Sequence, residues 1–390
     1  MALSIALLVK ALPLHRPGGQ ENHTWTLARG LVRGGHRVTV VTTAHPTGEG
    51  ELQIDGVRIV PLAGTAPGRN SWGFFGRIAR WLRVFEGEFD VIHAQGFAAL
   101  RAKPRLAPLV TTVHGTVWSE TPLAKAVRGH LGWGEWIAAM WRYRSRTLMG
   151  PLVHRQWRRS HRLICDSEFT RSEVLRRWPD WEPQVDVVPL GIEWLSAPPV
   201  RDEDLARRPI RLLSVGRQER VRGLGDLLEA LAGLPDPGRC HLTVVGGGPH
   251  LRAISRTAER LGLGAVVDLR GRVDDETLAG CWGEADLFVN PEWSQPAFGL
   301  VSLEALGQGL PVLGTRTGAT PEIVTAEVGW LVEPRRPEAL RERLAHLAAN
   351  PGEISARREA CRRRAEEFTV EAMVRGTERV YRKAVGARGD

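Results

Sequence analysis

The chain has 390 residues, enough for two ordinary domains, and its 43% hydrophobic and 25% charged residues are typical of a soluble globular protein. No run reaches the ~18 consecutive apolar residues of a membrane-spanning helix, so the sequence argues against a membrane-spanning chain. The formal net charge is +9, and residues 1–195 carry all of it, with 25 Lys+Arg against 16 Asp+Glu.

The cysteines and the apolar start of the chain bear on location. The stretch from Met1 to Leu14 lacks a basic start and is interrupted by Lys10, so we interpret it as a buried first strand and not as a signal peptide. Sparse cysteines without C-x-x-C spacing fit a reducing cytoplasm and no zinc or redox motif. We therefore expect a cytoplasmic protein, with the inner face of the membrane as an alternative location. The four cysteines are Cys165, Cys240, Cys281 and Cys361.

Short apolar stretches alternate with helical ones through residues 1–195. A loop with Gly18-Gly19 leads into a helix that carries Leu27, Leu31 and Val32 on one face and stops at Gly34-Gly35. This alternation predicts an α/β domain with a parallel, doubly wound sheet. The expected strands are Ser4–Val9, Arg37–Val41, Asp90–His93, Val110–Val113 and Arg162–Cys165.

The same alternation restarts after a polar, proline-bearing stretch, residues 196–209, which we expect to be a linker. It predicts a second Rossmann-like domain over residues 210–368. A last helix, residues 369–390, is expected to pack back toward the first domain, with Thr369 as its cap and Phe368 and Met373 as a hydrophobic staple. The expected strands are Arg211–Val215, His241–Val245, Val266–Leu269, Asp286–Val289 and Pro311–Leu313.

Glycines follow several of these strands. Gly18-Gly19, Gly216-Arg217 and Gly246-Gly247-Gly248 each lie between a strand and a helix, where doubly wound sheets bind ligands. A glycine there lets the backbone approach a ligand, and a helix N-terminus offers free N–H groups to phosphate. Tight turns also need glycine, so each loop alone supports either interpretation.

The segment from Phe298 to Leu306 begins as a loop and becomes a helix. The N–H groups of Leu300 and Val301 would be unpaired at its start. Glu304 falls one turn later, where a ribose attached to a bound phosphate would hang, and a carboxylate accepts two hydroxyl hydrogen bonds. The alternative is an ordinary exposed helix glutamate.

Taken together, these motifs resemble the retaining glycosyltransferases of family 4. The resemblance runs from about Gly18 to the last helix and implies the GT-B fold: two Rossmann-like domains that face each other across a cleft. It also implies use of a nucleotide sugar. The matching motifs are His36 after Gly34-Gly35, Asp90-Val91-Ile92-His93, Val113-His114-Gly115, Val215-Gly216-Arg217 with Arg222-Gly223, Phe298 to Ala305, Gly309-Leu310-Pro311-Val312 and Gly318 to Val324.

The resemblance implies roles for residues at the matching positions. His114 would contact the donor sugar near its 6-position, Arg217 would hold the diphosphate and Glu304 the ribose; with Arg222 these are the expected catalytic residues. No metal or cofactor is expected, because arginines and helix dipoles neutralise the leaving diphosphate. The expected donor-binding residues are Gly19, Gly216, Gly246, Gly248, Val273, Gln295, Phe298, Gly299, Leu300 and Val301. The expected acceptor-side residues are Gly18, His93 and Trp118, with a purely structural role as the alternative for His93.

The chain departs from the family pattern at two places. Arg222 stands where the family usually has lysine, which keeps the charge but changes the geometry. The family's paired glutamates, eight positions apart, would place the first at Pro296. Either Pro296 replaces that glutamate, or Gln295 stands in with one extra loop residue, so sugar identity and full activity are both open.

Two further segments invite other interpretations. Asp202-Glu203-Asp204 has the D-x-D pattern of metal sites in a different transferase fold, but it lies in the polar linker. Residues 74–85 and 128–162 combine arginines with tryptophans, which suits packed helices with solvated arginine faces or contact with an anionic membrane surface. The sequence carries no signature of a nucleic-acid-binding module, so no nucleic-acid partner is expected.

The leading hypothesis is an enzyme that moves a hexosyl or N-acetylhexosaminyl group from a nucleotide-diphosphate sugar to an acceptor, with retention and without a metal. Its acceptor is unknown, with an anionic or membrane-associated one favoured by the basic first domain. The alternatives are a sugar-nucleotide epimerase of the same fold, a weakly active nucleotide-sugar-binding partner protein, and a basic membrane adaptor.

Overall fold

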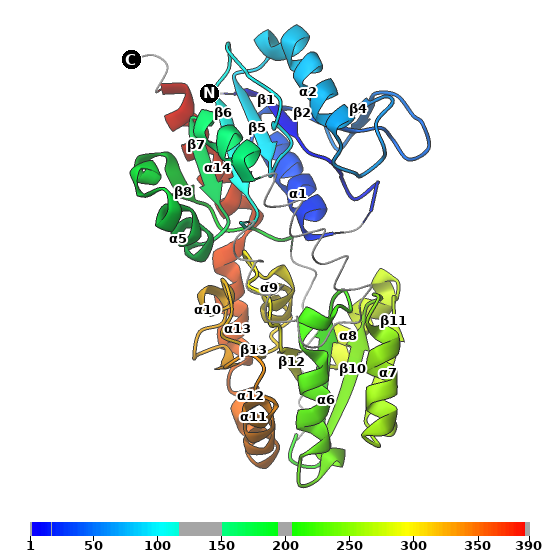
Figure 1. Cartoon of the computed structure of the whole chain (residues 1–390). Coiled ribbons are helices and arrows are strands. Elements are labelled where there is room, and N and C mark those ends of the chain that lie inside the picture. The colour runs from blue at the N-terminus through cyan, green and yellow to red at the C-terminus, as the bar shows by residue number, and fades with distance from the viewer. Residues whose placement is uncertain (1, 17, 117–149, 194–204, 387–390) are drawn as a thin grey trace. The chain divides into compact units, whose positions relative to one another are not determined.

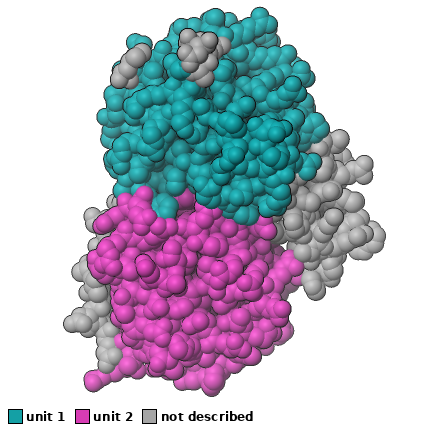
Figure 2. Space-filling model, turned by 90° about the vertical axis from the view of Figure 1, so that its left-hand side faces the viewer, with its two compact units in different colours: residues 1–193, 368–390 teal, residues 194–367 magenta. Residues whose placement is uncertain are grey.

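The structure is a computed structural model that describes residues 2–16, 18–116, 150–193 and 205–386. The chain divides into two compact units (Figure 2). Unit 1 contains Met1–Glu193 and Phe368–Asp390, and unit 2 contains Trp194–Glu367. No helix in the described part of the chain is long and apolar enough to cross a bilayer.

Unit 1 is built on an 8-stranded sheet in the order β3-β4-β2-β1-β5-β6-β7-β8 (Figure 1). Every neighbouring pair is parallel except β3 and β4. The predicted parallel, doubly wound sheet is thus confirmed. The elements are β1 (Ser4–Leu8), α1 (Gly19–Arg33), β2 (Arg37–Thr43), β3 (Leu52–Ile54), β4 (Val57–Leu62), α2 (Trp72–Phe85), β5 (Val91–Gln95), β6 (Leu109–Val113), β7 (Arg162–Cys165), α5 (Glu168–Arg177), β8 (Val185–Val187) and α14 (Val370–Gly386).

Three strands of this sheet were not predicted. β3 and β4 form a short hairpin whose turn, Asp55-Gly56, has positive φ at both residues. An Asp-Gly pair between two apolar stretches is a known hairpin signal, so this feature was readable in the sequence. β8 has three residues and lies at the sheet edge, where a short strand leaves little periodic pattern.

Both faces of this sheet are covered. α2 contributes Phe74 and Ile78 to the apolar cluster on one face, while α1 and α14 share the cluster on the other. Gly30 lets α1 and α14 approach closely: a Cβ there would lie 2.6 Å from Val374 Cγ2 and 2.9 Å from Val370 Cγ1. A parallel sheet buried on both faces explains why its strands read as unbroken apolar runs.

The terminal helix contacts the rest of unit 1 at its start and at its middle. The Ala372 N–H donates to the Thr369 hydroxyl at 3.1 Å, which confirms the expected cap. Thr369 also bridges to Ile192, so the outgoing and returning chain segments lie side by side. Further along α14, Glu378 contacts His36 Nε2 at 3.0 Å, while His36 Nδ1 accepts the Leu3 N–H. The family motif residue His36 therefore ties β1 to α14.

Unit 2 is built on a 6-stranded parallel sheet in the order β11-β10-β9-β12-β13-β14. Its five expected strands are present, and β14 is an additional edge strand. The elements are β9 (Ile210–Val215), α6 (Leu224–Ala232), β10 (Cys240–Val245), α7 (Leu251–Arg260), β11 (Val267–Gly271), α8 (Asp275–Glu284), β12 (Leu287–Asn290), α9 (Leu300–Gly307), β13 (Val312–Thr315), α10 (Thr320–Ile323), β14 (Gly329–Val332), α11 (Pro337–Ala349), α12 (Gly352–Ser355) and α13 (Arg358–Ala365).

The stretch expected to be a linker is partly built into unit 2. Leu205 is 5% exposed and belongs to the unit 2 core. Arg208 makes a bidentate pair with the buried Asp286, which also contacts Arg358 at 3.2 Å. Residues 205–209 are therefore part of the folded unit. Residues 194–204, with the D-x-D pattern at 202–204, lie outside the described residues.

Candidate active site

The first part of the candidate site is a cavity of about 110 Å³ in unit 1. It lies at the carboxyl ends of β1, β5 and β6, the edge where doubly wound sheets bind ligands. Three of its lining residues form the predicted motif Val113-His114-Gly115. We call it the unit 1 cavity. It is lined by Lys10, Gln20, Asn70, Gln95, Gly96, Phe97, Val113, His114, Gly115 and Trp157.

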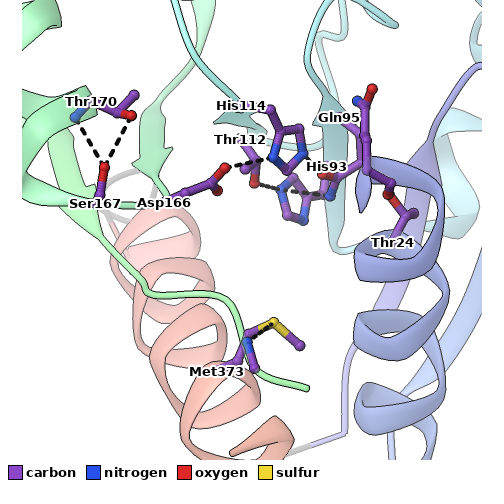
Figure 3. A network of polar contacts seen from close by, with 11 residues as sticks. Thr24, His93, Gln95, Thr112, His114, Asp166, Ser167, Thr170 and Met373 are labelled. Carbon is purple, nitrogen blue, oxygen red and sulfur yellow. Dashed lines mark hydrogen bonds and ion pairs between the residues drawn. The ribbon is translucent and has the colours of Figure 1, made fainter. Parts of the chain in front are cut away.

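His114 is held from both sides (Figure 3). Its Nδ1 lies 2.8 Å from Asp166 Oδ2, and its Nε2 lies 2.7 Å from Gln95 Oε1. Two acceptor oxygens are satisfied together only if both ring nitrogens carry a proton, or if the Gln95 amide is turned so that its NH₂ donates. A sugar hydroxyl that bonds to a ring nitrogen must therefore replace the Gln95 or the Asp166 contact.

His93 lies below this network in the core (Figure 3). It is fully buried, with Nδ1 2.7 Å from the Tyr381 hydroxyl and Nε2 2.7 Å from Thr112 Oγ1. Burial lowers its pKa to about 3, and neighbouring His114 acts in the same direction. These contacts link β5 and β6 to α14. His93 is not among the residues that line the cavity, so its structural interpretation accounts for its contacts better than the acceptor-side one.

His23 is a second buried histidine beside this network. Its ring packs edge-on against His114, with centroids 5.1 Å apart. Neither of its ring nitrogens finds a hydrogen-bond partner among the described residues. Burial, with His114 and His93 nearby, lowers its pKa well below the usual value. The ring is therefore neutral at physiological pH.

The glycines before α1 occupy the start of that helix. Gly18 is the N-cap in extended conformation, and the Glu21 carboxylate lies where a Cβ of Gly18 would point. Gly19 is the first helical residue and is exposed. Of the two, Gly19 is open to a ligand that approaches the helix N-terminus, whereas the Glu21 side chain lies beside Gly18. The third expected acceptor-side residue near this edge, Trp118, lies outside the described residues.

The second part of the candidate site is in unit 2, at the carboxyl ends of its strands. Several loops that follow strands are tied together there by backbone hydrogen bonds. The Gln218 N–H donates to the Gly247 carbonyl at 3.0 Å, the Trp293 N–H to Val221 at 2.7 Å, and the Ala319 N–H to Pro296 at 2.9 Å. The structure thus brings the expected donor-binding segments 216–223, 246–248 and 295–301 to one edge.

The glycines of these loops differ in what surrounds them. A Cβ on Gly216 would meet nothing within 4 Å, so this position faces open space as a ligand-approach glycine should. A Cβ on Gly246 would collide with the Gly216 carbonyl, and one on Gly248 with the Gln218 carbonyl. These two glycines therefore serve the packing of one loop on the next, which is the alternative that the sequence left open.

The N-terminus of α9 has the features expected of a phosphate site. Gly299 precedes it with φ 106°, and the N–H groups of Leu300 and Val301 donate to no described residue. Glu304 is exposed one turn further. Desolvation raises the pKa of the Glu304 carboxyl to about 7. The residue is exposed, so water also hydrates the carboxylate, and this hydration favours the charged form.

The residues beside this helix separate into exposed and buried ones. Gln295 is exposed, whereas the Pro296 backbone packs against Gly318. Of the two candidates for the missing glutamate, only Gln295 has a side chain that can hydrogen-bond a ligand. Phe298 is 5% exposed and packs inside unit 2. Val273 is half-buried in the loop between β11 and α8.

The two expected phosphate-binding arginines are held differently. Arg217 is 71% exposed at its side chain and pairs with the exposed Glu219, Nε to Oε1 3.1 Å. Arg222 is 36% exposed and donates to Oε2 of buried Glu292 at 2.8 Å. An exposed pair contributes little and is readily exchanged for a ligand, whereas the Arg222 pair is a fixed part of the site.

Sequence reasoning missed three polar residues of these sites. Asp166 follows β7 directly, and Glu292 comes two residues after β12, so both occupy the position at a strand end where site residues gather. Lys10 follows β1 in the same way, but it was considered only as an interruption of an apolar run. Asp166 and Glu292 pair with His114 and Arg222, which lie 52 and 70 positions away, so the sequence did not reveal these pairs.

The basic, tryptophan-bearing segments are described only in part. α2 turns Phe74, Phe75 and Ile78 into the core and leaves Trp72 58% exposed. In the second segment, residues 128–149 lie outside the described residues. Its described portion is helical over 150–159 and buries Trp157 at 1% exposure. For these portions the packed-helix interpretation accounts for most of the apolar side chains; membrane contact stays a prediction.

Fold and site together define a GT-B glycosyltransferase. The family model for Glycosyltransferase Family 4 matches residues 17–193, and that for Glycosyl transferases group 1 matches residues 200–368. The chain belongs to the glycosyltransferase family that these two models describe, group 1 or family 4, and it is an enzyme of the transferase class.

Several relatives carry specific activities in their names. The chain is 28% identical over 329 residues to an MMP alpha-(1->4)-mannosyltransferase of Mycolicibacterium hassiacum, covering 79% of this chain and 74% of that protein. It is 26% identical to a phosphatidyl-myo-inositol mannosyltransferase of Mycobacterium leprae, covering 86% and 84%. It is 33% identical to a GDP-mannose-dependent alpha-(1-6)-phosphatidylinositol dimannoside mannosyltransferase of Mycobacterium tuberculosis, covering 53% of this chain and only 54% of that protein.

Solved structures share the fold over nearly the whole chain. A sucrose-phosphate synthase from Thermosynechococcus elongatus superposes with a TM-score of 0.79 at 21% identity, covering 98% of this chain and 99% of that one. The Anabaena protein Alr3699/HepE in complex with UDP-glucose gives 0.69 at 18% identity, covering 97% and 99%. At this identity the likeness establishes the fold alone.

Proposed function

We propose that this glycosyltransferase moves a hexosyl group from a nucleotide-diphosphate sugar to a hydroxyl acceptor, with retention and without a metal ion. The observation that carries the proposal is the α9 N-terminus. There the Leu300 and Val301 amides have no described partner, and Glu304 is exposed one turn away. Amides that point out of a helix start suit a phosphate, and the carboxylate suits the two hydroxyls of a ribose.

The arginines of the β9–α6 loop supply the positive charge that such a donor needs. Arg217 is exposed and weakly paired, so it is free to exchange Glu219 for a diphosphate oxygen. Arg222 keeps one edge on Glu292 and has further N–H donors available. Two guanidinium groups and a helix terminus neutralise charge that develops on the leaving diphosphate, which is the role a metal plays elsewhere.

Retention follows if the acceptor attacks from the face that the diphosphate leaves. The acceptor oxygen forms a bond to the anomeric carbon, the bond from that carbon to the phosphate oxygen breaks, and the acceptor proton passes to the departing phosphate. This step requires no side-chain nucleophile. The leaving group acts as the base, so the contribution of the protein is to hold the diphosphate and exclude water.

GDP-mannose is the first donor to test, because one relative is named for its dependence on GDP-mannose and others are named as mannosyltransferases. UDP- and ADP-sugars complete the panel. Nucleotide release would be measured without an added acceptor, since water serves as a slow one. We expect release from one donor, with at least a tenfold loss in Arg217→Ala and Glu304→Ala.

Two matched substitutions control for charge and folding. Arg260→Ala removes an exposed arginine from the far end of α7, and Glu342→Ala an exposed glutamate from α11; both should release nucleotide at the wild-type rate. Equal rates in all five proteins would contradict the proposed donor site. Nucleotide binding with no release from any donor would favour a binding protein, and an isomerised sugar nucleotide would favour an epimerase.

A further inference from the structure

Lys10 projects from the end of β1 into the unit 1 cavity and has no assigned role. Its side chain is half-buried, and its ammonium makes no hydrogen bond or ion pair with a described residue. Burial lowers its pKa, with Glu21 opposing and Arg16 adding to that effect. Glu21 is itself paired with Arg16 at 3.0 Å. Among the described residues, these charges therefore leave one positive charge uncompensated.

The rest of the cavity wall also favours a negative ligand. Among the described residues that line it there is no aspartate or glutamate. Half-buried Gln20 and exposed Asn70 also line the cavity, and neither side chain hydrogen-bonds to another described residue. Asp166, the carboxylate behind the wall, is already bound to His114. A half-buried ammonium and two side-chain amides match an oxyanion, because each can donate N–H bonds to it in place of water.

We propose that the unit 1 cavity recognises an anionic oxygen group of the acceptor, a phosphate or a carboxylate, through Lys10 with Gln20 and Asn70. That this ligand is the acceptor rests on the proposed function; that the cavity binds an anion does not. The cavity holds a handful of water-sized groups, so it suits a charged substituent on a small ring and not a whole nucleotide. The donor diphosphate has its own cations and amides in unit 2, at Arg217 and the start of α9.

The test compares pairs of probes that differ in one charged group. Binding would be measured by calorimetry, without donor, for glucose 6-phosphate against glucose, myo-inositol 1-phosphate against myo-inositol, and glucuronate against glucose. We expect the wild type to bind at least one anionic probe at least tenfold more tightly than its neutral counterpart. Whether the phosphate or the carboxylate probe shows the larger preference identifies the group.

Substitutions then test whether Lys10 causes the preference for the anionic probe. Lys10→Gln should reduce it at least tenfold and Lys10→Arg should retain most of it. Lys103→Gln, which removes an exposed lysine of the same unit, should leave it unchanged. GDP and UDP should show the reverse dependence, with weaker binding to Arg217→Ala and unchanged binding to Lys10→Gln.

Three outcomes would overturn the proposal: no anionic preference in the wild type, an undiminished preference in Lys10→Gln, or a loss of nucleotide binding in Lys10→Gln equal to that in Arg217→Ala. The last would assign the lysine to the donor. Thermal unfolding of Lys10→Gln should occur at or above the wild-type temperature, because the substitution removes a desolvated charge. The binding of the anionic probes is measured without turnover. Failure of the proposed transferase function in the nucleotide-release assay would therefore not change the outcome of this binding test.

Discussion

Glu292 is the carboxylate that fixes Arg222 in unit 2. Its Oε2 accepts from Arg222 at 2.8 Å and its Oε1 from the Ser294 hydroxyl, and the residue is 5% exposed. It lies four positions before Pro296, where the family has its first glutamate. Each carboxylate oxygen accepts a bond from a protein side chain, and the bond from Arg222 holds that arginine in place.

Replacing Glu292 by glutamine should therefore disturb both the site and the fold. The amide keeps the volume but loses the charge-assisted bond, so we expect the free energy of unfolding to fall by about 1–3 kcal/mol. Nucleotide release should fall about tenfold or more, because a 1.4 kcal/mol loss in the placement of Arg222 is a factor of ten in rate. Urea titrations and the release assay measure the two effects.

Glu219→Gln is the matched control for this prediction. It removes a carboxylate from the β9–α6 loop that also carries Arg222, but the Arg217–Glu219 pair is exposed, so its loss should change stability by less than about 1 kcal/mol. If Glu292→Gln behaved like Glu219→Gln in both assays, Glu292 would have no positioning role.

The buried histidines make unit 1 sensitive to acid. His93 has a folded-state pKa of about 3, against about 6.5 in an unfolded chain. Between these values the unfolded chain binds a proton that the folded protein does not, so the free energy of unfolding falls as pH decreases from about 6.5 toward 3. Each such histidine contributes about 1.4 kcal/mol per pH unit in that window. His23, whose pKa is also lowered, acts in the same direction.

Urea titrations at pH 7, 6 and 5 would measure this slope in the wild type and in His93→Gln. The variant starts from a lower stability, because it loses the contacts to Tyr381 and Thr112, but its slope below pH 6.5 should be shallower by about 1.4 kcal/mol per unit. Equal slopes in the two proteins would mean that His93 is not held neutral by burial.

At the scale of elements, local sequence signals predicted most of the strands and a helix cap correctly. They did not predict which distant segments contact each other. The strand at Arg162–Cys165 and the Thr369 cap could be read from a few neighbouring residues. The contact between His114 and Asp166 joins residues 52 positions apart. No single sequence specifies which loops meet across a sheet edge, so the family resemblance pointed to His114 but not to its partner.

The glycines show the same limit. The sequence shows that a glycine follows a strand, but it does not show why glycine is needed there. Gly216 faces open space, whereas a neighbouring backbone leaves no room for a Cβ at Gly246 and Gly248. Gly30 lies inside α1, where glycine is unfavourable for a helix, and nothing near it in sequence explains it. Its reason is the approach of α14, which begins 340 positions later, at Val370.

Gly30→Ala tests the packing of α1 on α14. Helix propensity favours alanine by about 1 kcal/mol, but its Cβ would lie 2.6 Å from Val374 Cγ2. Valine is stiff at χ1 and cannot turn away freely, so the helices must separate. We expect a net loss of about 1–3 kcal/mol in the free energy of unfolding.

Gly76→Ala provides the comparison for that measurement. Gly76 lies inside α2, and its Cβ would meet nothing closer than Arg101 at 3.6 Å. Helix propensity should decide there, with a gain of up to about 1 kcal/mol. The prediction for Gly30 would be contradicted if both variants were stabilised.

At the scale of the whole molecule, unit 1 is assembled from both ends of the chain. The segment after Glu367 returns to the sheet begun at β1, and α14 completes one of its two apolar clusters (Figure 1). Unit 2 is continuous in sequence and has its own core. The two units should therefore respond differently to loss of the C-terminus.

A chain that ends at Glu367 should keep unit 2 but not a native unit 1. It loses six buried side chains of the shared cluster and the partners of His36 and His93, Glu378 and Tyr381. Exposed apolar surface of this kind binds hydrophobic dyes and promotes aggregation. We expect strong dye binding and loss of anionic-probe binding by unit 1. The six side chains are those of Val370, Met373, Val374, Val380, Tyr381 and Ala384.

The same truncated chain should still bind a nucleotide, because Arg217, Arg222 and the start of α9 lie in unit 2. A chain that ends at Gly386 retains all of α14 and serves as the control; it should match the full protein in both assays. Native-like unfolding of the chain that ends at Glu367 would show that residues 1–193 fold without α14. Loss of nucleotide binding along with the dye response would show instead that unit 2 depends on unit 1 for its stability.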